Sequence, residues 1–154
     1  MRVTDSSIIV LFVTICITSC NHAYKEYDKK SFSNMVWKYG QEISFNPKID
    51  DTSKSYALTL GLRHHYAIPL GFVNVMVKMI SPSGKETSKE YQLVMKDSAN
   101  NYFSKCGGDT CDLEVVVDEI TFAEQGDYTF IVTQVMENQH IVGIMEVGLI
   151  IDPK

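Results

Sequence analysis

The chain has 154 residues, of which 45% are hydrophobic, and carries a formal net charge of −5. This length corresponds to one domain, with a hydrophobic core large enough to fold without a structural metal. Because the balance is acidic and the sequence has no basic stripe, the chain repels phosphate backbones, which excludes nucleic acid as a partner.

The N-terminus has the pattern of a secretory signal. Residues 8–17 are uncharged and mostly apolar, and they follow Arg2. As a helix these residues extend about 15 Å, half of a ~30 Å hydrocarbon core, which is too short to span a bilayer but typical of a signal peptide. The alternative is a buried first element of a cytosolic domain, which the abrupt change to polar residues after Ser19 disfavours.

This segment ends in Ile17-Thr18-Ser19-Cys20, which resembles the lipobox of bacterial lipoprotein signal peptides. The resemblance implies that residues 1–19 are removed and that Cys20 becomes the lipidated N-terminus, with palmitate among its acyl groups. The protein would then work from a membrane. We expect residues 20–34 to be the lipidated N-terminus with a polar tether, and residues 35–154 to be the folded domain.

Beyond this tether, alternating apolar and polar residues predict strands. In residues 56–63 the apolar positions share one face, and residues 70–95 predict a hairpin. Its turn is Ser81-Pro82-Ser83-Gly84, in which Pro and Gly favour a chain reversal. Further strands are predicted at residues 113–117, 128–136 and 143–151.

Short strands without a convincing helical stripe predict an all-β fold, an antiparallel two-sheet β-sandwich of the immunoglobulin-like kind. Gly126-Asp127-Tyr128 adds a cue, because a tyrosine at this point of a strand resembles the tyrosine corner of such sandwiches. We also expect Trp37 to pack near the start of the domain.

Four cysteines are present, and two of them remain for the domain. Cys16 leaves with the signal peptide and Cys20 takes the lipid, which leaves Cys106 and Cys111. Two nearby thiols in an exported chain favour a disulfide, which would act as a local clip. The alternative is half of a zinc site, for which the sequence offers no second pair of cysteines.

Candidate catalytic and metal-binding residues are few. His64 and His65 are adjacent, so a strand would point them to opposite faces and they are expected to be an exposed or half-buried pair. The acidic pairs Asp50-Asp51 and Asp118-Glu119 lack calcium-loop spacing and are expected in solvated turns. No nucleophile elbow or phosphate loop is present. The sequence therefore predicts a non-enzymatic protein with no catalytic residues, no metal, no cofactor and no small-molecule substrate.

Between Trp37 and Asp152 a set of segments occurs in a characteristic order, namely Phe45 with Asp50-Asp51-Thr52, Tyr56 to Arg63 with Tyr66, Pro82-Ser83-Gly84-Lys85, Leu93, Gly107-Gly108-Asp109, Phe122 with Gly126, Tyr128 and Phe130, Gln134 with Met136, and Gly143 to Leu149. In this order they resemble the gliding motility lipoprotein GldH family of Bacteroidetes. The chain departs from the family at residues 67–72, at Glu137 and in the loop 102–111, where the two cysteines stand.

The resemblance implies a membrane-anchored component of gliding motility or of associated cell-envelope machinery. Its partners would be the membrane, through Cys20, and other envelope proteins, reached through exposed strand edges and the 97–112 loop. Asn21 is not the aspartate associated with inner-membrane retention in enterobacteria, which favours the outer membrane.

Two other functions remain open at this stage. One is a glycan- or peptide-binding sandwich unrelated to motility, in which Tyr91, Tyr102 and Phe103 would form an exposed stacking platform. The other is an enzyme, which would require a pocket that brings His64 or His65 beside a carboxylate and a nucleophile.

Overall fold

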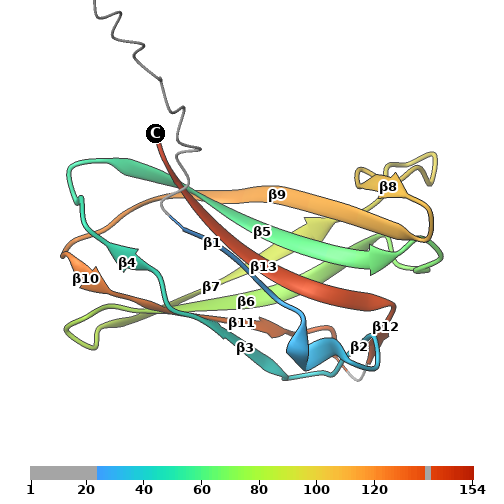
Figure 1. The fold of residues 1–154 in the computed structure, drawn as a ribbon, viewed down its shortest axis with the longest axis horizontal. Coiled ribbons are helices and arrows are strands. Elements are labelled where there is room, and N and C mark those ends of the chain that lie inside the picture. The colour runs from blue at the N-terminus through green and yellow to red at the C-terminus, as the bar shows by residue number, and fades with distance from the viewer. Residues whose placement is uncertain (1–23, 138–139) are drawn as a thin grey trace, which may run out of the picture.

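The computed structural model describes residues 24–137 and 140–154, which fold into two antiparallel sheets packed face to face (Figure 1). The five-stranded sheet has the order β1-β13-β5-β9-β8, with the bounds Tyr24–Asp28, Ile144–Pro153, Ser55–His65, Thr110–Thr121 and Lys105–Gly107. The four-stranded sheet has the order β3-β11-β6-β7, with the bounds Glu42–Phe45, Thr129–Gln134, Phe72–Ile80 and Glu86–Val94. The predicted antiparallel β-sandwich is therefore confirmed.

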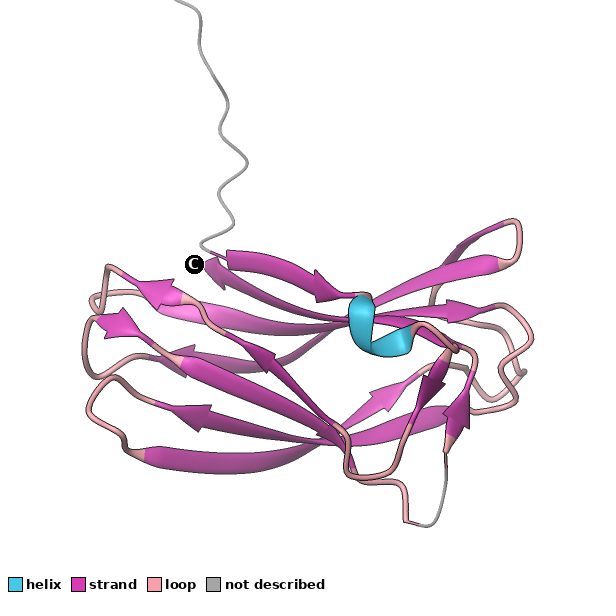
Figure 2. Cartoon of the chain, turned by 60° about the horizontal axis from the view of Figure 1, so that its bottom comes forward, coloured by secondary structure: helices cyan, strands magenta, loops and turns pink. Residues whose placement is uncertain are grey.

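Short elements complete the fold. Two small ladders pair β10 with β4 and β12 with β2, with the bounds Gly126–Asp127, Lys48–Ile49, Ile141–Val142 and Val36–Trp37. Figure 2 shows the single 3-10 turn, η1 (Lys30–Phe32), against the strands. Within the described ranges, no helix has the length and apolar character needed to cross a bilayer.

The core fills the space between the two sheets, because alternate side chains of each strand point inward. On β5 these are Leu58, Leu60 and Leu62, all buried. They face residues of β6 and β11 such as Val75 and Val132, which are also buried. Each such side chain contributes about 1.5–3 kcal/mol of burial free energy. Trp37 is buried as well, as the sequence predicts.

The predicted hairpin is confirmed as β6 and β7, in register from Phe72 with Val94 to Ile80 with Glu86. Its turn closes through hydrogen bonds from the Gly84 amide to the Ser81 carbonyl, at 2.8 Å, and from the Ser81 amide to the Lys85 carbonyl, at 2.9 Å. Gly84 has φ +85, a left-handed conformation that favours glycine.

The tyrosine corner also forms. Tyr128 is buried and its hydroxyl donates to the Glu124 carbonyl at 2.9 Å, four residues upstream. Its ring packs on Phe122, which also contacts Tyr56 and Phe130. This aromatic cluster closes one end of the core.

The N-terminal boundary of the domain differs from the prediction. The tether expected over residues 20–34 is wrong for its described part, because Tyr24–Asp28 is β1 and pairs with β13 from Tyr24 with Ile151 to Asp28 with Val147. The expected signal peptide, residues 1–19, lies outside the described residues. The domain therefore includes residues from Tyr24 onward.

Tyr27 holds β1 against the sheet. Tyr27 pairs with Gly148 on β13, Gly148 with Gly61 on β5, and Gly61 with Glu114 on β9. The ring of Tyr27 lies over both glycines, and its hydroxyl donates to Glu114 Oε1 at 2.8 Å. The side chain of Tyr27, on the edge strand β1, thus crosses β13 and β5 and contacts β9.

We expect Gly61→Ala and Gly148→Ala each to lower the free energy of unfolding by about 1–3 kcal/mol, as overpacking does. A Cβ at Gly61 would lie 2.3 Å from the Tyr27 hydroxyl oxygen, and one at Gly148 would lie 2.5 Å from Tyr27 Cε1. Urea denaturation measures the loss. Gly71→Ala is the control, because a Cβ there meets no atom within 4 Å.

Tyr27→Ala provides a control for the cause of this loss, because it removes the ring that the new methyl group at Gly61 or Gly148 would contact. Combined with Gly148→Ala, it should destabilise the protein by clearly less than the sum of the two single changes. Strict additivity would show that the ring and the glycines do not interact.

Candidate functional site

The expected lipidation site, Cys20, lies outside the described residues, but the structure locates the strand that follows it. Tyr24 pairs with Ile151 near the end of β13, whereas Ile144, at the start of β13, pairs with His64. Ile144 and Ile151 are seven residues apart, so at about 3.3 Å per residue β13 separates these two ends of the sandwich by about 23 Å. We call the end with Tyr24 the anchor end and the other the distal end.

The two cysteines of the domain lie at the distal end, on the hairpin formed by β8 and β9. Cys106 and Cys111 are directly opposite each other in register, and a disulfide joins them with an S–S distance of 1.98 Å. Cys111 is buried, whereas Cys106 is exposed. Gly108, with φ +63, allows the tight turn between them.

His64 lies under this hairpin, where it pairs in register with Cys111. Its Nδ1 lies 2.9 Å from the His65 carbonyl oxygen, which can only accept, so Nδ1 carries the proton. Its Nε2 therefore accepts from the Ser104 hydroxyl, at 2.8 Å. This bond fastens the 97–112 loop to the sheet.

The two adjacent histidines point to opposite faces, as expected, but the prediction of an exposed or half-buried pair is wrong for His64. It is completely buried, whereas His65 is partly exposed. His64 does meet a nucleophile, Ser104, yet its second nitrogen meets a backbone carbonyl instead of a carboxylate. Burial lowers the pKa of His64 and keeps the ring neutral.

The acidic pairs differ from each other. Asp50 and Asp51 lie in a loop, as expected, and form ion pairs with Lys48 and Lys54 at 3.1 and 3.2 Å. Asp118 and Glu119 do not lie in a turn, because both belong to β9. Here the sequence prediction is wrong.

A shift of register in β9 turns Asp118 inward. Leu58 pairs with Asp118 and Thr59 with Val116, so Val117 is an extra residue in β9, a β-bulge. Beyond the bulge, the side chain of Asp118 shares the inner face with that of Leu58. Strict alternation along β9 would have placed it outside.

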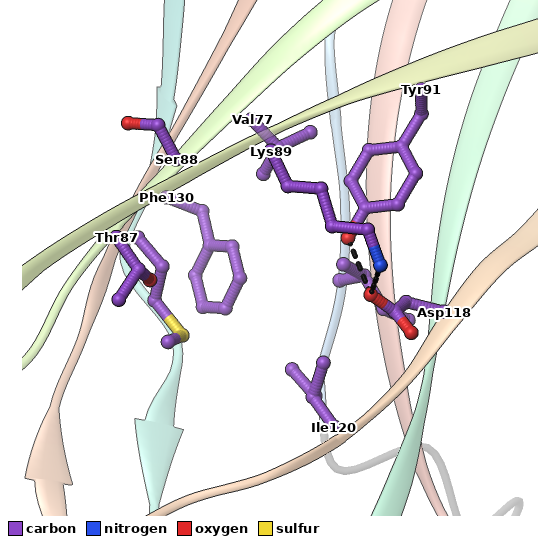
Figure 3. A pocket seen from close by; sticks show the side chains of 10 residues that line it. Val77, Thr87, Ser88, Lys89, Tyr91, Asp118, Ile120 and Phe130 are labelled. Carbon is purple, nitrogen blue, oxygen red and sulfur yellow. Dashed lines mark hydrogen bonds and ion pairs between the residues drawn. The ribbon is translucent and has the colours of Figure 1, made fainter.

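Asp118 lies at the mouth of a cavity between β7 of one sheet and β9 of the other (Figure 3). This side of the sandwich is opposite the side formed by the edge strands β1 and β3. Asp118 Oδ2 accepts from Lys89 Nζ at 2.8 Å and from the Tyr91 hydroxyl at 2.7 Å. The hydrogen bond from Lys89, followed by that from Tyr91, lowers the pKa of Asp118. Burial, followed by the hydrogen bond to Asp118, raises the pKa of Tyr91. The three side chains link the two sheets across the opening.

The exposed stacking platform proposed from the sequence does not form. The hydroxyl of Tyr91 points to Asp118, and that of Tyr102 donates to the Ile68 carbonyl at 2.8 Å. Both rings pack against the core, and only Phe103 of the three is largely exposed.

Exposed apolar side chains instead gather at the distal end. Seven large hydrophobic residues there are each at least 40% exposed, namely Met35, Tyr39, Tyr66, Phe72, Val94, Phe103 and Val142. They lie at the distal ends of the strands or in the adjoining loops, and backbone hydrogen bonds link several of these segments, such as Gly143 to Met35 and Tyr66 to Asp109. In contrast, Val116 projects from the outer face of the five-stranded sheet.

Other charged groups of the sheet are paired. Arg63 lies between Asp112, at 2.7 Å, and Glu146, at 3.0 Å, on the neighbouring strands. Hydrogen bonding to Asp112, followed by the charge of Glu146, raises the pKa of Arg63. Among the residues that the structure describes, no group of three or more His, Cys, Asp or Glu side chains is placed to hold a metal ion.

Comparisons with known proteins give one strong match. The model of the family described as GldH lipoprotein matches residues 23–151. No curated protein matches the chain.

Two solved structures show weak similarity, each at 14% sequence identity. One is the CBM35 from Cellvibrio japonicus Abf62, with a TM-score of 0.34 over 72% of this chain and 65% of that one. The other is TmCBM61 in complex with beta-1,4-galactotriose, with a TM-score of 0.30 over 83% of this chain and 77% of that one. We draw no argument from TM-scores this low.

We expect the stability of the protein to fall as pH drops below about 6.5, where an unfolded histidine takes up a proton. The folded protein resists this proton, because burial lowers the pKa of His64. The melting temperature at pH 7.5 and 5.5 measures the effect. His64→Gln should flatten this dependence and the partly exposed His65→Gln should keep it, whereas equal slopes in both variants would contradict the assignment.

Reduction of the Cys106–Cys111 bond should cost about 2 kcal/mol, the value expected for so short a loop. Alkylation without prior reduction, followed by mass spectrometry, should leave both side chains unmodified in the purified protein. Urea denaturation with and without a phosphine reductant then measures the loss. Free thiols in the protein purified from the envelope would contradict the prediction.

Proposed function

The chain belongs to the GldH lipoprotein family, and from this membership we propose that it is a non-enzymatic, membrane-anchored component of gliding motility or of the associated cell-envelope machinery. A diacylglyceryl group on Cys20 holds it in the membrane. Its folded domain acts by contact with other envelope proteins.

The anchor on Cys20 supplies stable attachment. Each buried methylene group contributes about 0.8 kcal/mol, and two acyl chains give the lasting attachment that one chain does not. We place the protein in the outer membrane, on the ground that Asn21 follows the lipidated cysteine.

The position of β1 supports a role that depends on orientation. Three residues separate Cys20 from Tyr24, so the two Cα atoms are four steps and at most about 14 Å apart. Tyr24 already belongs to the five-stranded sheet, and Tyr27 fixes this strand across three others. The domain therefore stays close to the membrane, with its anchor end toward the lipid.

The distal end supports contact with proteins. It carries seven of the eight large hydrophobic side chains that are strongly exposed in the described residues. Exposed apolar side chains concentrated in one region mark interaction surfaces, and tethering raises the effective concentration of the domain near its partners. The concentration of apolar residues at the end away from the anchor is the observation that carries the proposal.

We expect Cys20→Ala to abolish palmitate labelling and to move the protein from the membrane to the soluble fraction. In a strain without the gene, the wild-type chain should restore motility and envelope secretion, and Cys20→Ala should not, at equal protein levels. Cys16→Ala is the matched control, because it changes a cysteine of the signal segment and should leave labelling intact. Labelling that survives Cys20→Ala, or a deletion strain with normal motility and secretion, would refute the proposal.

A further inference from the structure

The cavity between β7 and β9 has no role in the proposed function, and its lining is unusual for a sandwich. Its volume is about 220 Å³, and it is partly open to solvent. Its floor is apolar and comes from both sheets, with Leu58, Val77, Met79, Ile120 and Phe130. Polar groups lie at its mouth, where Lys89, Tyr91 and Asp118 bind each other (Figure 3).

The inner face of β7 explains why this space is not filled. Thr87, Lys89 and Tyr91 pair in register with Met79, Val77 and Val75, so they share the inward face. A core strand would carry large apolar residues at these positions. Here Thr87 is short, and Lys89 reaches across to Asp118 on the opposite sheet, which leaves space above Val77.

We propose that this cavity binds a small, neutral, mainly apolar ligand of about the size of a substituted benzene ring, with one hydrogen-bond acceptor at its outer end. An apolar cavity of about 150 Å³ accommodates benzene, so this one has room for a ring and a short substituent. Small-molecule sites typically combine an apolar lining with a few polar groups.

The polar rim selects the charge of the ligand. Lys89 and Asp118 form an ion pair at 2.8 Å, so the mouth carries one positive and one negative charge. Both oxygens of Asp118 accept hydrogen bonds, from Lys89 and Tyr91 on one side and from the Glu119 amide on the other. Lys89 has three N–H donors, of which one reaches Asp118. A neutral acceptor can bind Lys89 without separating the pair, whereas a charged head group would meet a like charge.

An inward-facing charge also protects a sheet edge from pairing with another chain, and such a role alone would need no ligand. The two roles differ in one measurable property. A protective pair leaves the cavity empty, but a binding site takes up ligand saturably and loses it when the cavity is filled.

The test uses the mature chain from residue 20 on, with Cys20→Ser, so that no detergent competes for the cavity. Benzyl alcohol is the neutral probe, and benzoate and benzylamine are its charged counterparts. Two-dimensional amide NMR follows the titration, and intermolecular NOEs to the methyl groups of Leu58, Val77 and Ile120 locate the ring.

Saturable binding of benzyl alcohol with a Kd below about 1 mM is expected, with NOEs to these methyl groups and at least tenfold weaker binding of both charged probes. Thr87→Phe, at an exposed position facing the cavity, should weaken binding at least tenfold. Thr121→Phe makes the same exchange on β9 at an exposed position outside the cavity lining, and should leave affinity within twofold.

The proposal fails if the folded wild-type chain shows no saturable binding, or if Thr87→Phe binds as well as Thr121→Phe. Equal affinity for a charged probe overturns the proposed ligand class. None of these outcomes tests membrane attachment or motility, so failure of the cavity proposal and failure of the proposed function are distinguishable.

Discussion

The contact between Tyr27 and two facing glycines is the interaction on which the arrangement of this protein depends. β1 is a five-residue edge strand with a hydrogen-bonded neighbour on one side only. Backbone pairing of so short a strand at an edge is prone to local opening. The ring of Tyr27 adds a contact over Gly148 and Gly61, and its hydroxyl adds a hydrogen bond to Glu114, so that β1 is held by side-chain contacts to the next three strands of the sheet. Since β1 follows the proposed lipid anchor, we propose that this contact couples the membrane to the sandwich.

In the proposed function, this coupling gives the domain a defined orientation at the membrane. A flexible tether would let the sandwich rotate and present any surface to its neighbours. In the proposed function, a strand that enters the sheet within a few residues of the lipidated Cys20 instead keeps the anchor end near the lipid and the distal end away from it. The exposed apolar residues lie at that distal end. The side cavity between β7 and β9 lies away from the distal end, so the proposed partner contact and the proposed ligand binding do not compete for one surface.

Local patterns predicted those parts of the fold that depend on neighbouring residues. The β6–β7 hairpin follows from alternation and from a Pro-Gly turn, and the corner at Tyr128 from a short motif. β1 was missed because Tyr24–Asp28 is polar and does not alternate, and the glycines that receive Tyr27 are far away in sequence. Alternation predicts a strand that stops at residue 117 and a turn at Asp118, because it does not anticipate the extra residue, Val117, that turns Asp118 inward on β9. The burial of His64 depends on Ser104, which lies 40 positions away.

The central claim is that the distal end meets other envelope proteins while the chain is anchored through Cys20. The most direct measurement places a photo-crosslinking amino acid at Tyr66 or at Val116 in intact cells. Both side chains are exposed, at 51% and 64%, but Tyr66 is at the distal end and Val116 is on the outer sheet face. The account predicts discrete crosslinks to envelope proteins from position 66, few from position 116, and none from position 66 in a Cys20→Ala background. Equal crosslinking from both positions, or crosslinks that persist without the anchor, would contradict it.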